Sequence, residues 1–328
     1  MKPSALKQAL PHMVNEQAPV FIWGAPGVGK SDVVGQVAES MKFELRDVRL
    51  SLLDPIDLKG FPTINTVKKQ MEWLPADFLP KKGKGVLFLD ELNAAPQSVQ
   101  AAAYQLILNR KIGEYKLPDG WSVLAAGNRA SDRSVVHAMP AALANRFVHI
   151  DFEISVDDWN FWAMENEVHD DLRAFIQFRP NLLHNFDSAS NPRAFPSPRS
   201  WSFVNKQYKK NLPQDIEYEL VKGTVGEGAA AEFSGFVRLI KDLPNVNQVL
   251  IDPDSVKVPE NPAAMYAMVT ALDSKATTGN LDRIMKYTDR LPVEFQAVFV
   301  RSATRRDKKL TGTKSYMNWC VKNQAVLL

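Results

Sequence analysis

The chain has 328 residues, of which 45% are hydrophobic and 23% are charged, and its formal net charge is +3. This composition is typical of a globular protein with about two domains, and it argues against an extended basic surface for a polyanion. A single cysteine, Cys320, excludes an internal disulfide framework and is typical of a reducing compartment. No segment has the apolar length of a signal peptide or a membrane span, so we expect a cytoplasmic protein with no membrane partner.

The first chemically distinctive segment is residues 24–31, which have the G-x-x-x-x-G-K-S spacing of a phosphate-binding loop. A short apolar run, residues 20–23, precedes the loop, and a pattern with one apolar helical face follows it. The glycines let backbone N–H groups turn toward a phosphate, Lys30 can reach the β- and γ-phosphates, and Ser31 can offer its hydroxyl to Mg²⁺. We therefore expect a phosphate site made by Gly24, Ala25, Pro26, Gly27, Val28, Gly29, Lys30, Ser31 and Asp32.

Residues 60–74 predict a β-hairpin that interrupts the strand–helix alternation. Two short runs, which contain Phe61, Ile64 and Trp73, flank a polar turn at residues 65–69. We expect this hairpin to project from the core and to present apolar side chains.

Residues 85–91 read Gly-Val-Leu-Phe-Leu-Asp-Glu, an apolar strand that ends in two acids. In this position we expect Asp90 to support the Mg²⁺ held by Ser31, and Glu91 to polarise a water that attacks the γ-phosphate. A phosphate loop alone fits a kinase, a GTPase, a transporter subunit or a motor. The acid pair narrows this choice, because small-molecule kinases seldom need it and the guanine-specifying Asn-Lys-x-Asp of GTPases is absent.

Residues 111–124 predict a second hairpin, in which residues 112–117 and 121–124 flank a Pro-Asp-Gly turn. Tyr115 and Trp121 would then lie on a projecting element. The same region ends in Ala-Ala-Gly-Asn, and Asn128 would follow a core strand. There we expect its amide to hold the attacking water or the γ-phosphate.

Five apolar runs over residues 1–152 are short enough for buried strands of a parallel sheet: 20–23, 43–50, 86–89, 123–126 and 147–152. They predict an α/β fold, a three-layer P-loop NTPase core with helices on the faces of the sheet. Helical patterns dominate from residue 153 onward. We expect an all-helical lid over 153–243 and a C-terminal helical extension over 244–328.

The motifs together resemble those of an AAA+ ATPase of the MoxR group, the branch with a hairpin inserted in the second helix. Besides the loop and the acidic strand with the Leu92-Asn93 that follows it, the similarity includes four segments: residues 54–60, 126–129, 144–147 and 196–201. It covers about residues 10–205 with specific motifs and the remainder only through its helical character.

The resemblance implies Mg²⁺-dependent ATP hydrolysis and assigns roles to two arginines. Arg146 matches the arginine finger, which enters the site of the neighbouring subunit, and Arg199 matches the second sensor at the start of a lid helix. Arg110 and Arg133 are further candidates for contacts across a subunit boundary. A finger supplied by a neighbour implies that the active form is an oligomer.

The resemblance further implies a homo-oligomeric ring, most often of six subunits, that remodels or activates a client protein. Partners of this group often carry a von Willebrand factor A domain. Two alternatives stay open: a nucleic-acid motor or loader, and a regulatory scaffold that binds ATP and turns it over slowly. The basic clusters of the chain are short and interleaved with acids, which does not favour the nucleic-acid alternative.

Overall fold

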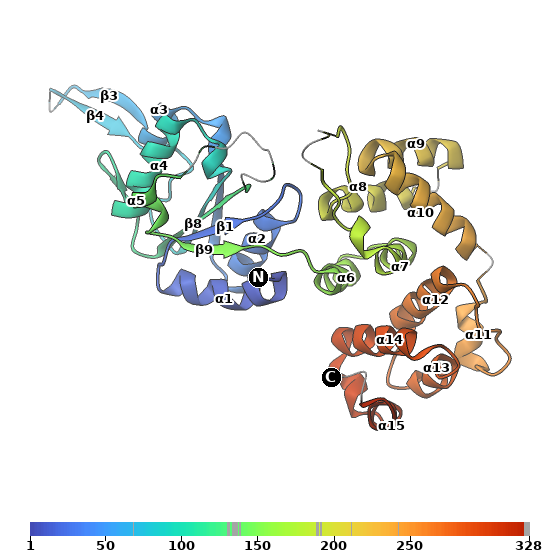
Figure 1. The fold of residues 1–328 in the computed structure, drawn as a ribbon. Coiled ribbons are helices and arrows are strands. Elements are labelled where there is room, and N and C mark those ends of the chain that lie inside the picture. The colour runs from blue at the N-terminus through green and yellow to red at the C-terminus, as the bar shows by residue number, and fades with distance from the viewer. Residues whose placement is uncertain are drawn as a thin grey trace. The chain divides into compact units, whose positions relative to one another are not determined.

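The computed structural model describes the chain except residues 68, 130, 131, 133–136, 138, 188, 189, 191, 211, 242 and 325–328. The chain divides into two compact units (Figure 1): Met1–Ile154 with Asp187–Asn191, and Ser155–Phe186 with Pro192–Leu328. In the first unit the helices and strands are α1 (Pro3–Asn15), β1 (Val20–Trp23), α2 (Lys30–Ser40), β2 (Glu44–Arg49), α3 (Pro55–Lys59), β3 (Phe61–Asn65), β4 (Gln70–Leu74), β5 (Gly85–Asp90), α4 (Gln97–Asn109), β6 (Lys111–Ile112), β7 (Tyr115–Lys116), β8 (Trp121–Gly127), α5 (Ala141–Ala144) and β9 (Val148–Asp151).

The core of this unit is a five-stranded parallel sheet in the order β2-β5-β8-β1-β9. Alternate residues of its strands enter two apolar clusters. In β5, Val86 and Phe88 pack with α1 and α2, whereas Leu87 and Leu89 pack with α4. The predicted three-layer α/β core is therefore confirmed, and the sheet is buried on both faces as parallel sheets usually are.

The first hairpin consists of β3 and β4, which pair antiparallel and extend away from the sheet (Figure 1). At its base Gly60 has φ of 90°, and a Cβ atom there would lie 2.0 Å from the carbonyl oxygen of Leu74. Only glycine therefore lets the two strands begin at this point without displacing one of them.

The second hairpin differs from the prediction over 111–124. Only β6 and β7 pair, through Lys111–Lys116 and Ile112–Tyr115, whereas β8 joins the central sheet between β5 and β1. The reason is burial: Trp121 is fully buried, and its indole N–H donates to the carbonyl of Lys82 at 3.1 Å. Trp121 is thus a core residue and not part of a projecting surface.

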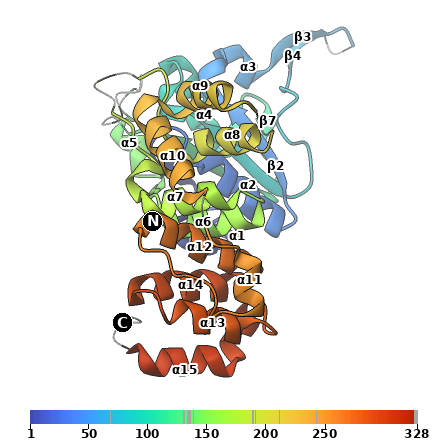
Figure 2. The same ribbon diagram turned by 90° about the vertical axis from the view of Figure 1, so that its right-hand side faces the viewer.

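The second unit is helical in its secondary structure (Figures 1 and 2). Its α-helices are α6 (Val156–Glu165), α7 (Asp170–Phe178), α8 (Pro198–Tyr208), α9 (Gln214–Val225), α10 (Glu227–Ile240), α11 (Val246–Ile251), α12 (Pro262–Lys275), α13 (Leu281–Thr288), α14 (Val293–Arg306) and α15 (Lys314–Lys322). Two apolar clusters fill this unit, one among α6–α10 and one among α11–α15. Helix α12 belongs to both, because Ala263 and Ala267 face the first cluster while Met268 and Leu272 face the second.

A buried ionic network also joins α7 to α12. The Arg173 guanidinium, 2% exposed, donates to Asp273, 1% exposed, at 2.9 Å. It also bonds Asp170 at 2.9 Å and the Asn160 Oδ1 at 3.1 Å. Because a buried charge is stable only when it is paired and hydrogen-bonded, this network ties the C-terminal helices to those that precede them.

Candidate functional site

The candidate site lies at the carboxyl ends of β1, β5 and β8, where three of the predicted motifs meet. The loop after β1 leads directly into α2, whose N-cap is Gly29 with φ of 98°. Gly27 also has a positive φ, 77°. These left-handed positions turn successive N–H groups toward one point, and the amino end of α2 adds its partial positive charge there.

Lys30 and Asn128 are brought together in this site. Lys30 is 9% exposed, and its ammonium donates to the carbonyls of Gly24 at 2.6 Å and Ala25 at 3.0 Å. It also donates to the Asn128 Oδ1 at 3.1 Å. A lysine held this way at a helix amino terminus gives the site a fixed positive charge, which suits a phosphate group.

Ser31 and Asp90 also meet, because the Ser31 hydroxyl donates to the Asp90 Oδ2 at 3.0 Å. The other oxygen of Asp90 accepts the backbone N–H of Glu91 at 2.9 Å. A hydroxyl and a carboxylate beside a phosphate loop are oxygen ligands of the kind that Mg²⁺ takes together with substrate phosphates. The Ser31 hydroxyl and the Asp90 carboxylate would thus fit an Mg²⁺ that arrives with a nucleotide. In the described part of the chain no group of three or more His, Cys, Asp or Glu side chains could hold a metal ion.

Glu91 occupies a left-handed backbone position, φ 56°, directly after β5. Its carboxylate accepts the Ser51 hydroxyl and lies 3.6 Å from the Arg49 Nε. Neither Arg49 nor Ser51 was identified from the sequence. Nothing in the sequence indicated this contact, because Arg49 ends β2 and Ser51 lies two residues later, and only the order of the strands places β2 beside β5.

A further carboxylate, that of Asp47 in β2, lies close enough to Asp90 and Asp32 to interact with their charges. Partial burial raises its pKa, as do the negative charges of Asp90 and Asp32, while Arg49 acts in the opposite direction. These acids therefore repel one another, and a divalent cation would relieve that repulsion.

The backbone of Asn128 is held by a hydrogen bond from Asn93. Asn93 is 3% exposed, and no role for it was predicted from the sequence. The Asn93 Nδ2 donates to the carbonyl of Asn128 at 2.7 Å. A Cβ atom on Gly127 would lie 2.1 Å from the Asn93 Oδ1, so glycine is needed for this close approach. Asn93 and Gly127 are thus positioning residues for Asn128.

The remaining predicted residues lie in different surroundings. In the loop, Val28 is buried while Ala25 and Pro26 are half-buried, and Asp32 is exposed on the first turn of α2. Arg146 is exposed just after α5. Arg199 is exposed in the first turn of α8, which belongs to the second unit.

Of the two further arginines, Arg110 holds its own unit together. Its guanidinium donates to the carbonyls of Pro118 at 3.0 Å and Trp121 at 2.7 Å, which fixes the second hairpin to β8. Arg133 lies outside the described residues.

Comparison with known proteins agrees with this geometry. Residues 19–149 match the family model described as "ATPase family associated with various cellular activities (AAA)". Over 175 residues, 50% of this chain, the sequence is 26% identical to Midasin of Giardia intestinalis, of whose length the chain spans only 4%.

Similar solved structures include a putative ATPase of Cytophaga hutchinsonii, 15% identical, with a TM-score of 0.38 and coverage of 99% of this chain and 88% of that one. A RuvB variant of Thermotoga maritima is 16% identical, with a TM-score of 0.39 and coverage of 76% of this chain and 73% of that one. No helix in the described parts of the chain is long and apolar enough to cross a membrane. Residues 19–149, which contain the phosphate loop and most of the central sheet, thus match the model of the AAA ATPase family.

Proposed function

We propose that the chain is a cytoplasmic, Mg²⁺-dependent ATPase of the MoxR-like AAA+ type, which acts as a ring of six subunits and remodels or activates a client protein. The observation that carries the proposal is that two pairs of side chains, Lys30 with Asn128 and Ser31 with Asp90, make contact at the carboxyl ends of the parallel strands. These side chains come from the ends of three different strands or the loops after them. Their convergence supplies a phosphate-binding lysine, oxygen ligands for Mg²⁺ and an amide beside the lysine.

Within this proposal each residue has one task. The loop N–H groups and Lys30 bind the β- and γ-phosphates, and the bound Mg²⁺, held by Ser31 and Asp90, would neutralise the charge that develops on the phosphates. Glu91 accepts a proton from the attacking water. Asn128 orients that water or the γ-phosphate, and Arg199 senses the γ-phosphate from the lid.

Arg146 is proposed to act on the neighbouring subunit. Its side chain is exposed and forms no ion pair with the described residues of its own chain, as expected of an arginine whose partner lies elsewhere. A guanidinium supplied by a neighbour can stabilise transition-state charge strongly, so an isolated subunit would hydrolyse ATP slowly.

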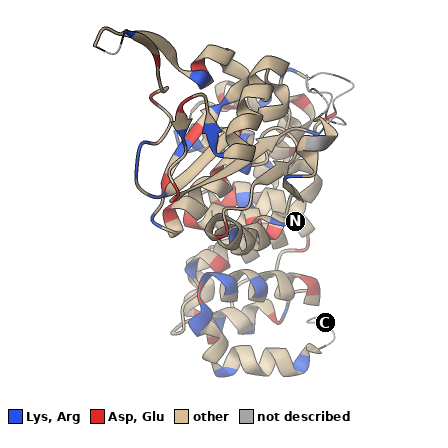
Figure 3. Ribbon diagram, turned by 90° about the vertical axis from the view of Figure 1, so that its left-hand side faces the viewer, with Lys and Arg blue, Asp and Glu red and all other residues tan. Residues whose placement is uncertain are grey.

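The first hairpin is the proposed contact for the client. Because directly opposite residues of an antiparallel pair share a face, Pro62 with Trp73 and Ile64 with Met71 make one apolar face. Ile64 is 78% exposed, Met71 is 60% exposed and Val67 at the turn is 91% exposed. Exposed apolar side chains gathered in this way indicate a protein-binding surface. Both Lys or Arg and Asp or Glu occur in each part of the ribbon (Figure 3), and this mixture of signs favours a protein client over nucleic acid. The resemblance to the MoxR group suggests a client or adaptor with a von Willebrand factor A domain.

The test is hydrolysis of ATP by the purified chain with and without Mg²⁺. We expect Lys30→Met to lose nucleotide binding, whereas Glu91→Gln should bind ATP and hydrolyse it about 10²–10⁴-fold more slowly. A chain that binds no adenine nucleotide would contradict the proposal. So would a Glu91→Gln variant that hydrolyses at the normal rate, or hydrolysis that only DNA or RNA stimulates.

A mixing experiment tests the ring. Arg146→Ala and Lys30→Met should each be inactive alone, because one lacks the finger and the other lacks a working site. In mixed oligomers a Lys30→Met subunit supplies Arg146 to a neighbour whose own site is intact. Partial recovery of activity on mixing is therefore expected, and no recovery would contradict a finger that acts in trans.

A further inference from the structure

The second unit contains a cavity of about 360 Å³ to which none of the roles above assigns a ligand. It is bounded by the start of α7, the end of α8, α9 and α10. The side chains that matter for its chemistry are Asp171, Tyr208, Glu217, Tyr218, Phe233 and Lys241. This size is within the range of ordinary ligand pockets.

The first acidic group of the cavity is Asp171, whose side chain is 29% exposed. Its Oδ2 accepts the Tyr208 hydroxyl at 2.7 Å. Burial and this hydrogen bond raise the pKa of Tyr208, so the phenol stays protonated and donates to Asp171 as a neutral group.

His169 is the nearest ring to Asp171 at this side of the cavity for which a distance is known. The His169 Nδ1 lies 3.6 Å from the Asp171 Oδ2 and accepts the backbone N–H of Asp171 at 3.2 Å. Among the described residues, no lysine or arginine forms an ion pair with Asp171.

The second acidic group is Glu217, half-buried on α9. Burial raises its pKa, and the positive charge of Lys241 acts against that rise. Lys241 is exposed and makes no ion pair with Glu217 or any other described acid. A partly buried carboxylate without a close cationic partner is costly, and a bound cation would reduce that cost.

Aromatic rings make up much of the remaining wall. Tyr208 packs edge-to-face against Phe233 at 5.6 Å and against His169 at 4.8 Å, and Tyr218 lines the same cavity. Rings beside carboxylates suit a side chain with an apolar stem and a cationic end, because the stem packs on the rings and the charge meets the acids.

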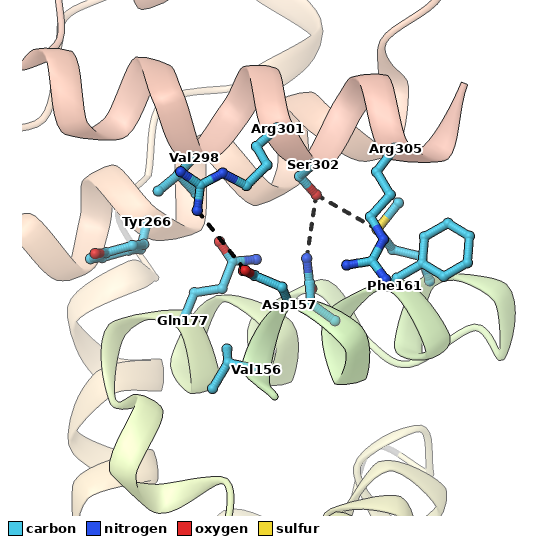
Figure 4. Close-up of a pocket in the computed structure, with 11 residues that line it drawn as sticks. Val156, Asp157, Phe161, Gln177, Tyr266, Val298, Arg301, Ser302 and Arg305 are labelled. Atoms are coloured by element: carbon cyan, nitrogen blue, oxygen red, sulfur yellow. Dashed lines mark hydrogen bonds and ion pairs between the residues drawn. The ribbon is translucent and has the colours of Figure 1, made fainter. Parts of the chain in front are cut away.

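A second cavity in the same unit, about 130 Å³ between α6 and α14, has different chemistry (Figure 4). There Arg301 lies 3.9 Å from Asp157, and Arg305 bonds Asp158 at 2.6 Å. Ser302 accepts the Asn160 amide at 3.3 Å across the two helices. The two arginines are already paired with acids, so this cavity is a packing gap between two helices and gives no reason to expect a ligand.

We propose that the cavity bounded by α7–α10 binds a lysine or arginine side chain of a protein partner, with its charge at Asp171 and Glu217 and its stem against Tyr208 and Tyr218. The occupant follows from charge complementarity, since the described residues that line the site include two carboxylates, Asp171 and Glu217, and a single lysine, which is exposed. The inference does not depend on nucleotide binding.

The test uses the full chain and two small probes, N-acetyl-arginine amide and N-acetyl-citrulline amide, with binding measured by calorimetry and by saturation-transfer NMR. Citrulline has the shape of arginine without its charge. We expect the arginine probe to bind at least about tenfold more tightly than the citrulline probe. Glu217→Gln and Asp171→Asn should each weaken arginine binding about tenfold, while Glu219→Gln, on an exposed position of the same helix, should change it less than about twofold.

Equal affinity for the two probes, or no detectable binding of the arginine probe, would overturn the proposal. So would wild-type affinity in both the Glu217→Gln and Asp171→Asn chains. If either variant fails to fold by circular dichroism, the comparison of the two probes on the wild-type chain decides alone.

Discussion

Both units bury charged groups, but they satisfy those groups in different ways. In the second unit, Arg173 meets Asp273 and Asp170 directly, so positive and negative charges cancel within the protein. In the first unit, Lys30 donates to carbonyl and amide oxygens, and Asp90 accepts from a hydroxyl and a backbone N–H. These named partners of Lys30 and Asp90 are all uncharged groups. The comparison distinguishes the Arg173 network, which stabilises the fold, from the network of Lys30 and Asp90, whose arrangement suits a ligand.

The largest effect is expected where charges cancel. Replacing Arg173 with methionine leaves Asp273 buried, with Arg306, at 3.5 Å, as its one remaining cationic partner among the described residues. We expect a loss of about 3–5 kcal/mol in the free energy of unfolding of the second unit. Urea unfolding followed by circular dichroism and tryptophan fluorescence measures it.

The control for this change is Arg179→Met. Arg179 pairs with Glu232 at 2.8 Å, but both side chains are nearly half exposed, at 48% and 46%. An exposed pair of this kind contributes less than about 1 kcal/mol. Similar losses for the two variants would show that the Arg173 network is not a stabilising one.

At the carboxyl ends of the strands in the first unit we expect a substitution to lower ATP hydrolysis and to leave the stability of the fold nearly unchanged. Asp90→Asn keeps an acceptor for the Glu91 N–H but removes an anionic ligand for Mg²⁺. Hydrolysis should fall about 10²-fold or more, while the free energy of unfolding changes by less than about 1 kcal/mol, because repulsion with Asp47 is also removed. A large loss of stability with normal hydrolysis would place Asp90 among the structural charges instead.

A smaller effect is expected from the residues that position Asn128. Gly127→Ala would push Asn93 away, since the new Cβ would lie 2.1 Å from its Oδ1. We expect a loss of about 1–3 kcal/mol in stability and of about tenfold in hydrolysis.

Gly35→Ala is the matched control for Gly127→Ala. Gly35 lies inside α2, and the nearest atom to a Cβ there is the Leu45 Cδ2 at 3.8 Å, an ordinary contact. Alanine favours a helix interior, so this variant should be equally stable or more stable by up to about 1 kcal/mol. Equal behaviour of the two variants would mean that the close approach at Gly127 is unimportant.

The smallest effect on stability is expected at the first hairpin. Ile64→Ser combined with Met71→Ser removes an exposed cross-strand pair, so the free energy of unfolding should change by less than about 0.5 kcal/mol. Client retained by the Glu91→Gln chain in ATP should nevertheless fall several-fold. The pair on the other face, Thr63→Ala with Glu72→Ala, is the control, and equal losses from both pairs would argue against an apolar client contact.

The sequence allowed prediction of the elements whose signal is local. The phosphate loop, the acidic end of β5 and the five apolar runs are each complete within a few residues, and they led to the correct sheet. The pairing of 121–124 with 112–117 was wrong because a short apolar run after a turn has the same pattern in a hairpin and in a buried strand. Only the position of Trp121 inside the core distinguishes them.

Contacts between distant segments could not be predicted. Arg49 and Ser51 reach Glu91 only because β2 neighbours β5, and the order of strands is not written in any one segment. Arg173 and Asp273 are 100 residues apart, and neither belongs to a motif. The roles of Arg146 and Arg199 depend on a neighbouring subunit and on the lid, so they remain predictions.

The two oxygens of the Asp90 carboxylate have separate duties, one toward the backbone of the next residue and one toward Ser31. This division sets the length of the side chain. A glutamate would carry its oxygens one carbon farther from the main chain, where the same group could no longer brace the bend and face the serine at once. An aspartate at position 90 followed by a glutamate at position 91 is therefore a steric requirement as well as a chemical one. Exchanging Asp90 and Glu91 would not be a conservative change.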